Sequence, residues 1–222
     1  MLISFLPLNC MEITFLGHSS FKLRGKSTSL ITDPYNPSVG LKFPKAEANI
    51  VTISHNHPDH NYKEAVLGNP FVASGPGEYE VAGVKIVGIA SYHDSKGGKE
   101  KGVNTIYSIK MDGVTIAHLG DFGQNELSDR QLEQLGDVSI LIIPIGGVYT
   151  VDGETATKIV SQIEPKIVIP MHYFDKDLNV NLEKAEKFLK EMGQEKPEVL
   201  KKITVKREGL PPEVRVILME KS

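Results

Sequence analysis

The 222-residue sequence contains no tryptophan and a single cysteine, Cys10. One cysteine cannot form an internal disulfide bond or a cysteine-based metal cage, which indicates a reducing compartment, and we expect the cytoplasm. The chain also lacks a surplus of positive charge, since its net charge is −3. Nucleic-acid-binding proteins commonly carry a basic excess. We therefore expect a small-molecule substrate and regard nucleic acid as a disfavoured partner; a homo-oligomer is compatible with the sequence.

Long hydrophobic runs are also missing. The apolar residues 1–10 have no basic segment before them, are too few for a signal peptide and are interrupted by Pro7, so we expect no membrane association. With 40% hydrophobic and 24% charged residues, the chain has the composition of a globular protein. No linker rich in proline, glycine or serine divides it. We predict an N-terminal extension, residues 1–10, and one domain, residues 11–222.

The first half of the chain consists of short segments typical of β-strands, separated by turn residues. The expected strands cover residues 12–16, 21–23, 29–32, 50–53, 84–89, 105–110 and 114–118. Asp112 and Gly113 predict a tight hairpin turn because both residue types tolerate a positive φ. The stretch Val81-Ala-Gly-Val84 predicts a second turn of the same kind.

The second half alternates between expected helices and strands. A capping-box pattern begins at Ser128, and apolar residues at helical spacing follow Asp152 and Asn181. Glycine or proline ends these three stretches at residues 136, 165 and 193. Strands are expected over residues 138–143, 166–170, 203–206 and 214–219, the last two as a hairpin. This order predicts a layered α/β or α+β domain.

Ligand-type side chains are concentrated in the segment Ser-His-Asn-His-Pro-Asp-His, residues 54–60. On an extended chain, side chains two residues apart point the same way, so His55 and His57 face one side together. Pro58 turns the chain, which aims Asp59 and His60 elsewhere at the start of an expected helix, residues 61–67. One segment can therefore serve two adjacent ions. Imidazole and carboxylate ligands suit zinc, and also iron, manganese, nickel and cobalt. The plainer alternative is a polar loop with solvated histidines.

From Met11 onward the sequence resembles the metallo-β-lactamase superfamily. Five motifs stand in the family's order, at residues 32–34, 54–60, 91–94, 118–121 and 170–173. The opening segment Ile-Thr-Phe-Leu-Gly-His-Ser-Ser-Phe and the segment Pro-Ile-Gly-Gly-Val-Tyr-Thr, residues 144–150, are similar to the ascorbate-phosphate-lactonase-like branch of stand-alone metal-dependent hydrolases. The resemblance implies a four-layer αββα sandwich, in which helices flank two mixed β-sheets.

The same resemblance implies a site for two divalent ions, with zinc as the expected metal. The implied ligands are His55, His57 and His93 for one ion, Asp59, His60 and His172 for the other, and Asp121 as the bridge. Taken alone, the two outlying histidines at 93 and 172 have plainer interpretations, as a loop residue and a strand-end core residue.

Three further residues are expected close to this site. Asp33 is expected to be a buried carboxylate that hydrogen-bonds the metal loop and holds it in place. His118 lies three residues before the bridging aspartate and is expected in the core or beside the ligands. His18 follows the first strand, and we expect it to point into the pocket as a substrate contact, a proton carrier or an additional ligand.

A lysine-bearing loop over residues 94–101 is expected to be flexible. Its side chains Lys96, Lys99 and Lys101 predict either a solvated loop of mixed charge or a rim that attracts an anionic, phosphorylated substrate. Tyr149 and Thr150 end a strand at the same expected edge. They are candidate pocket residues, with a turn and the start of a helix as the alternative.

The expected chemistry is hydrolysis. Divalent ions lower the pKa of bound water from near 16 to about 7, which makes a metal-bound hydroxide the expected nucleophile, with Asp59 orienting it or accepting its proton. Histidine at position 57 disfavours the di-iron oxygen-reducing members, and aspartate at 121 disfavours the common zinc β-lactamases. We expect cleavage of an ester, lactone or phosphoester. The alternatives are a phosphodiesterase or nuclease acting on nucleotides and a non-catalytic protein for metal storage or sensing.

Overall fold

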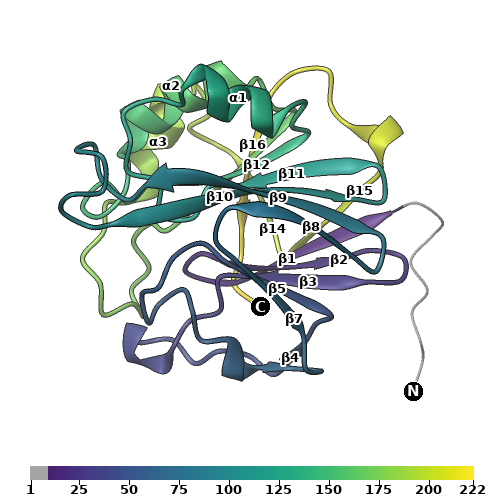
Figure 1. Ribbon diagram of the computed structural model, residues 1–222. Helices are drawn as coiled ribbons and strands as arrows, with labels where there is room; N and C mark the ends of the chain where they lie inside the picture. The colour runs from purple at the N-terminus through teal and green to yellow at the C-terminus, as the bar shows by residue number, and fades with distance from the viewer. Residues whose placement is uncertain (1–9) are drawn as a thin grey trace.

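The computed structural model describes residues 10–222, so the expected N-terminal extension lies outside the described part except for Cys10. Two β-sheets stack face to face, and the helices cover the outer face of the larger sheet (Figure 1). The α-helices of the described residues are α1 (Asp129–Leu135), α2 (Gly153–Ile163) and α3 (Ala185–Glu191). No helix within residues 10–222 is long and apolar enough to cross a membrane.

The smaller sheet has six strands and is mixed. Its order is β15 (Lys202–Val205), β1 (Met11–Gly17), β2 (Ser20–Arg24), β3 (Ser29–Thr32), β5 (Ile50–Ile53) and β7 (Phe71–Ser74). Pairing is antiparallel from β15 to β3 and parallel from β3 to β7. Parallel pairing brings the ends of β3 and β5 to one edge of the sheet.

The larger sheet has eight strands and is also mixed. Its order is β14 (Glu198–Leu200), β16 (Arg215–Met219), β13 (Ile167–Met171), β12 (Ile140–Pro144), β11 (Val114–His118), β10 (Val103–Met111), β9 (Val84–Tyr92) and β8 (Gly77–Val81). Neighbouring strands from β11 through β12, β13 and β16 to β14 pair in parallel. Neighbouring strands from β8 through β9 and β10 to β11 pair as antiparallel hairpins. The two mixed sheets confirm the sandwich expected from the sequence.

Three buried layers follow from the alternation of side chains along the strands. Ile13 and Ile109 belong to the layer between the sheets, and Leu141 packs with the helices on the other face of the larger sheet. On the outer face of the smaller sheet, Ile31 packs against Tyr35 and neighbouring loop residues. That outer cover contains the 3₁₀ turns η1 (Pro37–Val39) and η2 (Lys63–Ala65) and the short strands β4 (Ala46–Glu47) and β6 (Val66–Leu67).

Local signals in the sequence set several boundaries correctly. The capping box at Ser128 is formed, and the Asp152 side chain accepts from the amide of Thr155 at the start of α2. Asp112 has φ 48° and forms, with the following glycine, the expected β10–β11 turn. These features follow from hydrogen bonds or backbone angles within a few residues, which is why the sequence reveals them.

Two expected helices differ in the structure. Residues 61–67 form the turn η2 followed by β6, because the Tyr62 amide donates to the Pro34 carbonyl and fixes the chain to a neighbouring loop. Helix α3 begins at Ala185 instead of directly after Asn181. Its expected first turn is extended, since the amide of Glu183 donates to Gly146 and its carbonyl accepts from Phe174.

The expected hairpin near the end of the chain is wrong. Strand β15 pairs with β1 in the smaller sheet, whereas β16 pairs with β13 and β14 in the larger one. The connection contains the 3₁₀ turn η3 (Arg207–Gly209) and two prolines, Pro211 and Pro212, which cannot donate backbone hydrogen bonds to a ladder. The segment therefore crosses from one sheet to the other.

Candidate metal centre

The predicted ligands and their supporting residues lie where strands end, at one edge of the sandwich. His18 follows β1, Asp33 follows β3, residues 54–60 follow β5, His93 follows β9, and His172 follows β13. Asp121 comes three residues after β11. Because the carboxyl ends of parallel strands meet at the same edge, residues far apart in sequence come together there.

One group of donors consists of His55, His57 and His93. His55 Nε2 lies 3.0 Å from His57 Nδ1, and His93 Nε2 lies 3.3 Å from Asp121 Oδ2. Donor atoms of the three histidines all lie within 4.8 Å of one another. His57 is exposed, whereas His55 and His93 are buried, so this group meets solvent on one side.

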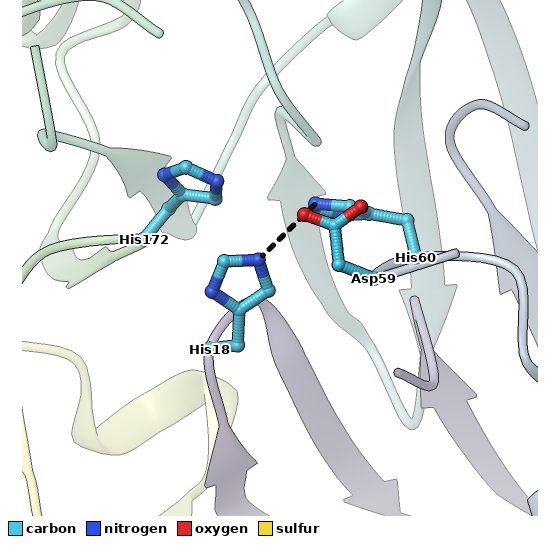
Figure 2. Close-up of side chains that lie close together, drawn as sticks. All are labelled: His18, Asp59, His60 and His172. Carbon is cyan, nitrogen blue, oxygen red and sulfur yellow. Dashed lines mark hydrogen bonds and ion pairs between the residues drawn. The ribbon is translucent and has the colours of Figure 1, made fainter. Parts of the chain in front are cut away.

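The second group consists of His18, Asp59, His60 and His172, and Figure 2 shows these four side chains converging. His60 Nε2 lies 3.6 Å from Asp59 Oδ2, and His18 Nε2 lies 3.3 Å from the same oxygen. Asp121 lies between the two groups, with Oδ1 3.3 Å from His60 Nε2 and Oδ2 3.3 Å from His172 Nε2. The structure thus brings the seven predicted ligand residues together, and His18, which was expected to point towards them, lies in the second group.

The donor set fits divalent metal ions. Bonds of about 2.0–2.1 Å in a tetrahedral zinc site place neighbouring ligand atoms roughly 3.3 Å apart, close to the separations seen here. His60 Nε2 and Asp121 Oδ1 are buried without a hydrogen-bond partner among the described residues. Buried polar atoms are normally paired, so two facing atoms without a hydrogen-bond partner fit a cation held between them.

Asp33 supports this cluster from behind, as expected. Its carboxylate accepts hydrogen bonds from the Ser54 amide (2.8 Å), from the Ser54 hydroxyl and from His60 Nδ1 (2.9 Å). The Ser54 oxygen in turn lies 2.9 Å from His55 Nδ1. Because these contacts engage Nδ1 of both histidines, Nε2 of each ring is left to face the cluster.

His118 lies in the core beside the ligands, which agrees with its sequence-based placement. Its Nε2 donates to the Ser19 carbonyl at 2.9 Å, and its Nδ1 accepts from the Gly120 amide at 3.3 Å. The ring therefore connects the turn that carries His18 to the turn that carries Asp121.

Sequence reasoning missed Asn104. Its side-chain oxygen accepts from the Asp121 amide at 3.1 Å, and its amide nitrogen donates to Leu119 O and Ser91 Oγ, each at 2.8 Å. The available signal was an asparagine at the start of an apolar strand, where a buried amide must find partners.

Backbone strain is concentrated at the same edge. His18, Asp33 and His172 have φ values of 54°, 36° and 51°. Left-handed backbone angles are costly for residues other than glycine, and such strain persists where the surrounding structure enforces it. Three residues of the cluster therefore hold their side chains in positions that relaxed strand ends would not provide.

Burial and neighbouring charges set the ionisation of the cluster. Burial, reinforced by the other histidines, lowers the pKa of His18 to about 4 and that of His55 to about 3. Burial would raise the pKa of Asp121, but His172 and His60 outweigh it and hold that pKa well below its usual range. Burial would lower the pKa of His60, but Asp121 and Asp33 outweigh it and raise that pKa well above its usual value. Neutral imidazoles and ionised carboxylates are the forms that bind metals, so His60 has to lose a proton when a metal ion binds.

A cavity of about 490 Å³ opens above the cluster. Its lining residues are His57, Asp59, His93, Glu100, Lys101, Asp121, Tyr149, His172 and Val180. Of the six pocket residues predicted from sequence, only Lys101 and Tyr149 line this cavity, and His18 instead lines a second pocket, which also contains His172. Lys96 is exposed and pairs with Glu100, Lys99 is exposed, and the buried hydroxyl of Thr150 donates to Val151 O.

The lysine-bearing loop, for which flexibility was expected, contains a set of backbone hydrogen bonds to one carboxylate. The Asp94 carboxylate accepts backbone hydrogen bonds from Lys96, Gly98, Glu100 and Lys101 at 2.8–2.9 Å. These four N–H groups keep the pKa of Asp94 below its usual range. Lys101 Nζ donates to the carbonyls of Val148 and Tyr149, and lies 5.4 Å from the centre of the Tyr149 ring. The loop is thereby fastened to the opposite rim.

The family profile described as "Beta-lactamase superfamily domain" matches residues 12–172, which include every predicted ligand. The chain belongs to this superfamily. A UPF0173 metal-dependent hydrolase from Thermococcus onnurineus is 34% identical, and the match covers 73% of this chain and 84% of that relative. The chain is thus a member of a family of metal-dependent hydrolases.

Solved structures of the superfamily agree with this assignment. A candidate Zn-dependent hydrolase from Thermotoga maritima superposes with a TM-score of 0.77 and 33% identity, over 95% of this chain and 99% of that chain. Igni18, a metallo hydrolase from Ignicoccus hospitalis, superposes with a TM-score of 0.63 and 21% identity, over 93% of this chain and 94% of that chain. The second likeness concerns the fold alone.

Proposed function

We propose that the protein uses two divalent metal ions, zinc being the first candidate, to hydrolyse an ester, lactone or phosphoester bond in a small anionic substrate. His55, His57 and His93 would hold one ion, Asp59, His60 and His172 the other, and Asp121 would contact both. The observation that carries this proposal is the lining of the 490 Å³ cavity. Asp59, Asp121 and histidines of both donor groups line this same cavity.

Bound divalent ions supply two kinds of chemistry at such a site, because they activate water at neutral pH and polarise a carbonyl or phosphoryl oxygen. Asp59 contributes a carboxylate with 27% of its side chain exposed, at the base of the cavity. Burial would raise the pKa of Asp59, but His18 and His60 outweigh it and hold that pKa below its usual range. The group stays ionised at neutral pH, so it can accept a hydrogen bond from an attacking water and orient it. A lowered pKa makes a carboxylate a weak base, which favours this orienting role over acceptance of the proton.

The rim supports an anionic substrate. Lys101 is the lysine that lines the cavity, and its ammonium group lies at the edge over Tyr149. Backbone carbonyls take two of its hydrogen-bonding positions, which fixes the charge in place without neutralising it. A fixed cation beside a metal cluster attracts a phosphate or carboxylate group on the substrate.

The proposal is tested with the full chain loaded separately with zinc and manganese. Each form is assayed with a p-nitrophenyl acetate, a γ-lactone, bis(p-nitrophenyl) phosphate and a chromogenic β-lactam. We expect turnover of at least one of the first three, and a fall of about 10²–10⁴-fold in kcat for Asp59→Asn, the range for loss of a group that positions or transfers the reacting proton. Metal uptake without turnover of any probe would instead support a binding protein.

A further inference from the structure

His18 lies in a turn whose backbone is fixed on both sides. The residue joins β1 to β2 with φ 54°, and its carbonyl accepts from the amide of His172 at 3.1 Å. The next carbonyl, of Ser19, accepts from His118. The His18 side chain is fully buried. The turn therefore presents the imidazole to the cluster in one orientation.

The ring faces the second group of donors. Its centroid lies 4.4 Å from that of His172 and 5.1 Å from that of His60 (Figure 2). Its Nε2 lies 3.3 Å from Asp59 Oδ2. A charge-assisted N–H to carboxylate hydrogen bond is typically about 2.7–2.9 Å, whereas two ligands of one zinc ion lie roughly 3.3 Å apart. The observed separation is the one expected for two ligands of the same ion.

Hydrogen bonding alone does not satisfy this imidazole. His18 Nδ1 is buried and has no partner among residues 10–222. If the proton is on Nε2, the hydrogen bond from Nε2 to Asp59 Oδ2 is long. If the proton is on Nδ1, the lone pair of Nε2 faces the negatively charged carboxylate oxygen of Asp59, and the two repel each other. A cation between Nε2 and Asp59 removes this second conflict. A metal bound at Nε2 requires the tautomer that has the proton on Nδ1, and this N–H has no acceptor among residues 10–222, so the support for a cation comes from Nε2 alone.

We propose that His18 is an additional metal ligand, which joins Asp59, His60, His172 and the shared Asp121 to give the second ion five protein donors. The first ion would have the three histidines of its group and the shared Asp121, and one of these histidines, His57, is exposed. The second ion would thus have one protein donor more than the first, and its three histidines are all buried, so we expect it to be held more tightly.

The experiment titrates the metal-free full chain with Co²⁺ and follows the visible absorption, with a competing chelator to obtain both affinities. His18→Gly removes the ring and is compatible with the positive φ, and His18→Asn provides a second variant that tolerates this backbone. Ser19→Ala is the matched control, since it removes a buried hydroxyl from the same turn that has no partner among the described residues.

We expect the affinity of one of the two binding steps to fall by at least about 10–100-fold in both His18 variants. Removal of a residue that only hydrogen-bonds a metal ligand already costs this much affinity, so removal of a ligand should cost no less. The other step and the Ser19→Ala control should keep the parental affinities. Added imidazole should restore the weakened step in His18→Gly. Equal losses in both steps, or two unchanged steps, would overturn the assignment.

This inference rests on the proposed function only in requiring that two ions bind. If the parent binds two Co²⁺ ions and cleaves no probe substrate, the hydrolase proposal fails while the role of His18 stands. If the parent cleaves a probe and both His18 variants bind both ions with unchanged affinity, the role of His18 fails while the hydrolase proposal stands.

Discussion

The inner wall and the outer rim of the metal centre are built differently. The inner wall, formed by His18, His60 and His172, is at most 3% exposed and is supported by a buried carboxylate and by backbone hydrogen bonds. The outer rim, formed by the loop 94–101 and Tyr149, is held by hydrogen bonds at its surface, and Tyr149 is 43% exposed. A wall that cannot shift without breaking buried bonds suits ion retention, and a rim fastened by solvent-accessible contacts suits substrate passage.

The largest effect should come from removing the support of the inner wall. Asp33→Ala leaves the Ser54 amide and His60 Nδ1 buried without their acceptor. Breaking a buried charged pair costs about 3–5 kcal/mol, so we expect the free energy of unfolding to fall by that amount in urea denaturation. The surface change Asp137→Ala is the control and should stay within about 0.5 kcal/mol. A similar small loss in Asp33→Ala would mean that the inner wall is no more rigid than the rim.

Metal removal should have the next largest effect. An ion that binds only the native state at 1,000 times its dissociation constant adds about 4 kcal/mol of stability. For a domain of this size, that corresponds to a fall in Tm of about 8–16 °C after chelation, measured by scanning calorimetry. Lys101→Met should show the full metal-dependent shift, because its contacts belong to the rim. A smaller metal-dependent change in Tm in Lys101→Met would mean that the outer rim also contributes to metal binding, and the distinction between inner wall and outer rim would not hold.

Loosening the rim should change dynamics more than stability. Asp94→Ala removes the acceptor of four backbone amides in the loop 94–101. We expect hydrogen exchange of these amides to accelerate by at least about tenfold, while amides of β9 and β10 keep their protection. Unchanged exchange in the loop would show that other contacts hold the rim. Asp152→Ala, which removes a helix cap and no hydrogen bond of the loop 94–101, is the control.

The smallest effect should come from the rim lysine. Lys101→Met keeps the length of the side chain and removes its charge, so KM for an anionic substrate should rise by about two- to fivefold at low salt, the size of a partly screened surface interaction. The effect should shrink as salt is added. Lys99→Met is the matched control, because Lys99 is exposed and does not line the cavity. Equal increases in both variants would indicate general attraction by the loop.

The sequence predicted those parts of the site that depend on short stretches of chain. Residues 55–60 follow one strand, and their spacing alone divides them between two directions. His93, Asp121 and His172 were assigned through the family motifs, since their proximity depends on the order of strands in two sheets. The hydrogen bonds of Asn104 and the four backbone hydrogen bonds accepted by Asp94 were not predicted, because nothing near these residues in sequence reveals which backbone amide a polar side chain will contact.

The errors in the predicted fold have a related cause. Residues 61–67 and 181–184 have sequences that suit helices, but long-range backbone hydrogen bonds hold both segments extended or in a turn. Strands β15 and β16 satisfy the pattern of a hairpin, yet each finds a partner made much earlier in the chain. Local secondary-structure preference is overridden where the edge of a strand distant in sequence provides more backbone hydrogen bonds.

The crossing of the chain between β15 and β16 has a consequence for the order of folding. β15 completes the pairing of β1, from a position more than 180 residues later in the chain. Contacts between such distant segments form slowly, because a long loop must close before they are made. During synthesis, the turn that carries His18 is therefore anchored to a strand with one unpaired edge until residues 202–205 have left the ribosome. Mature metal binding should accordingly be a late event, and truncation before residue 202 should abolish it even though every proposed ligand is present.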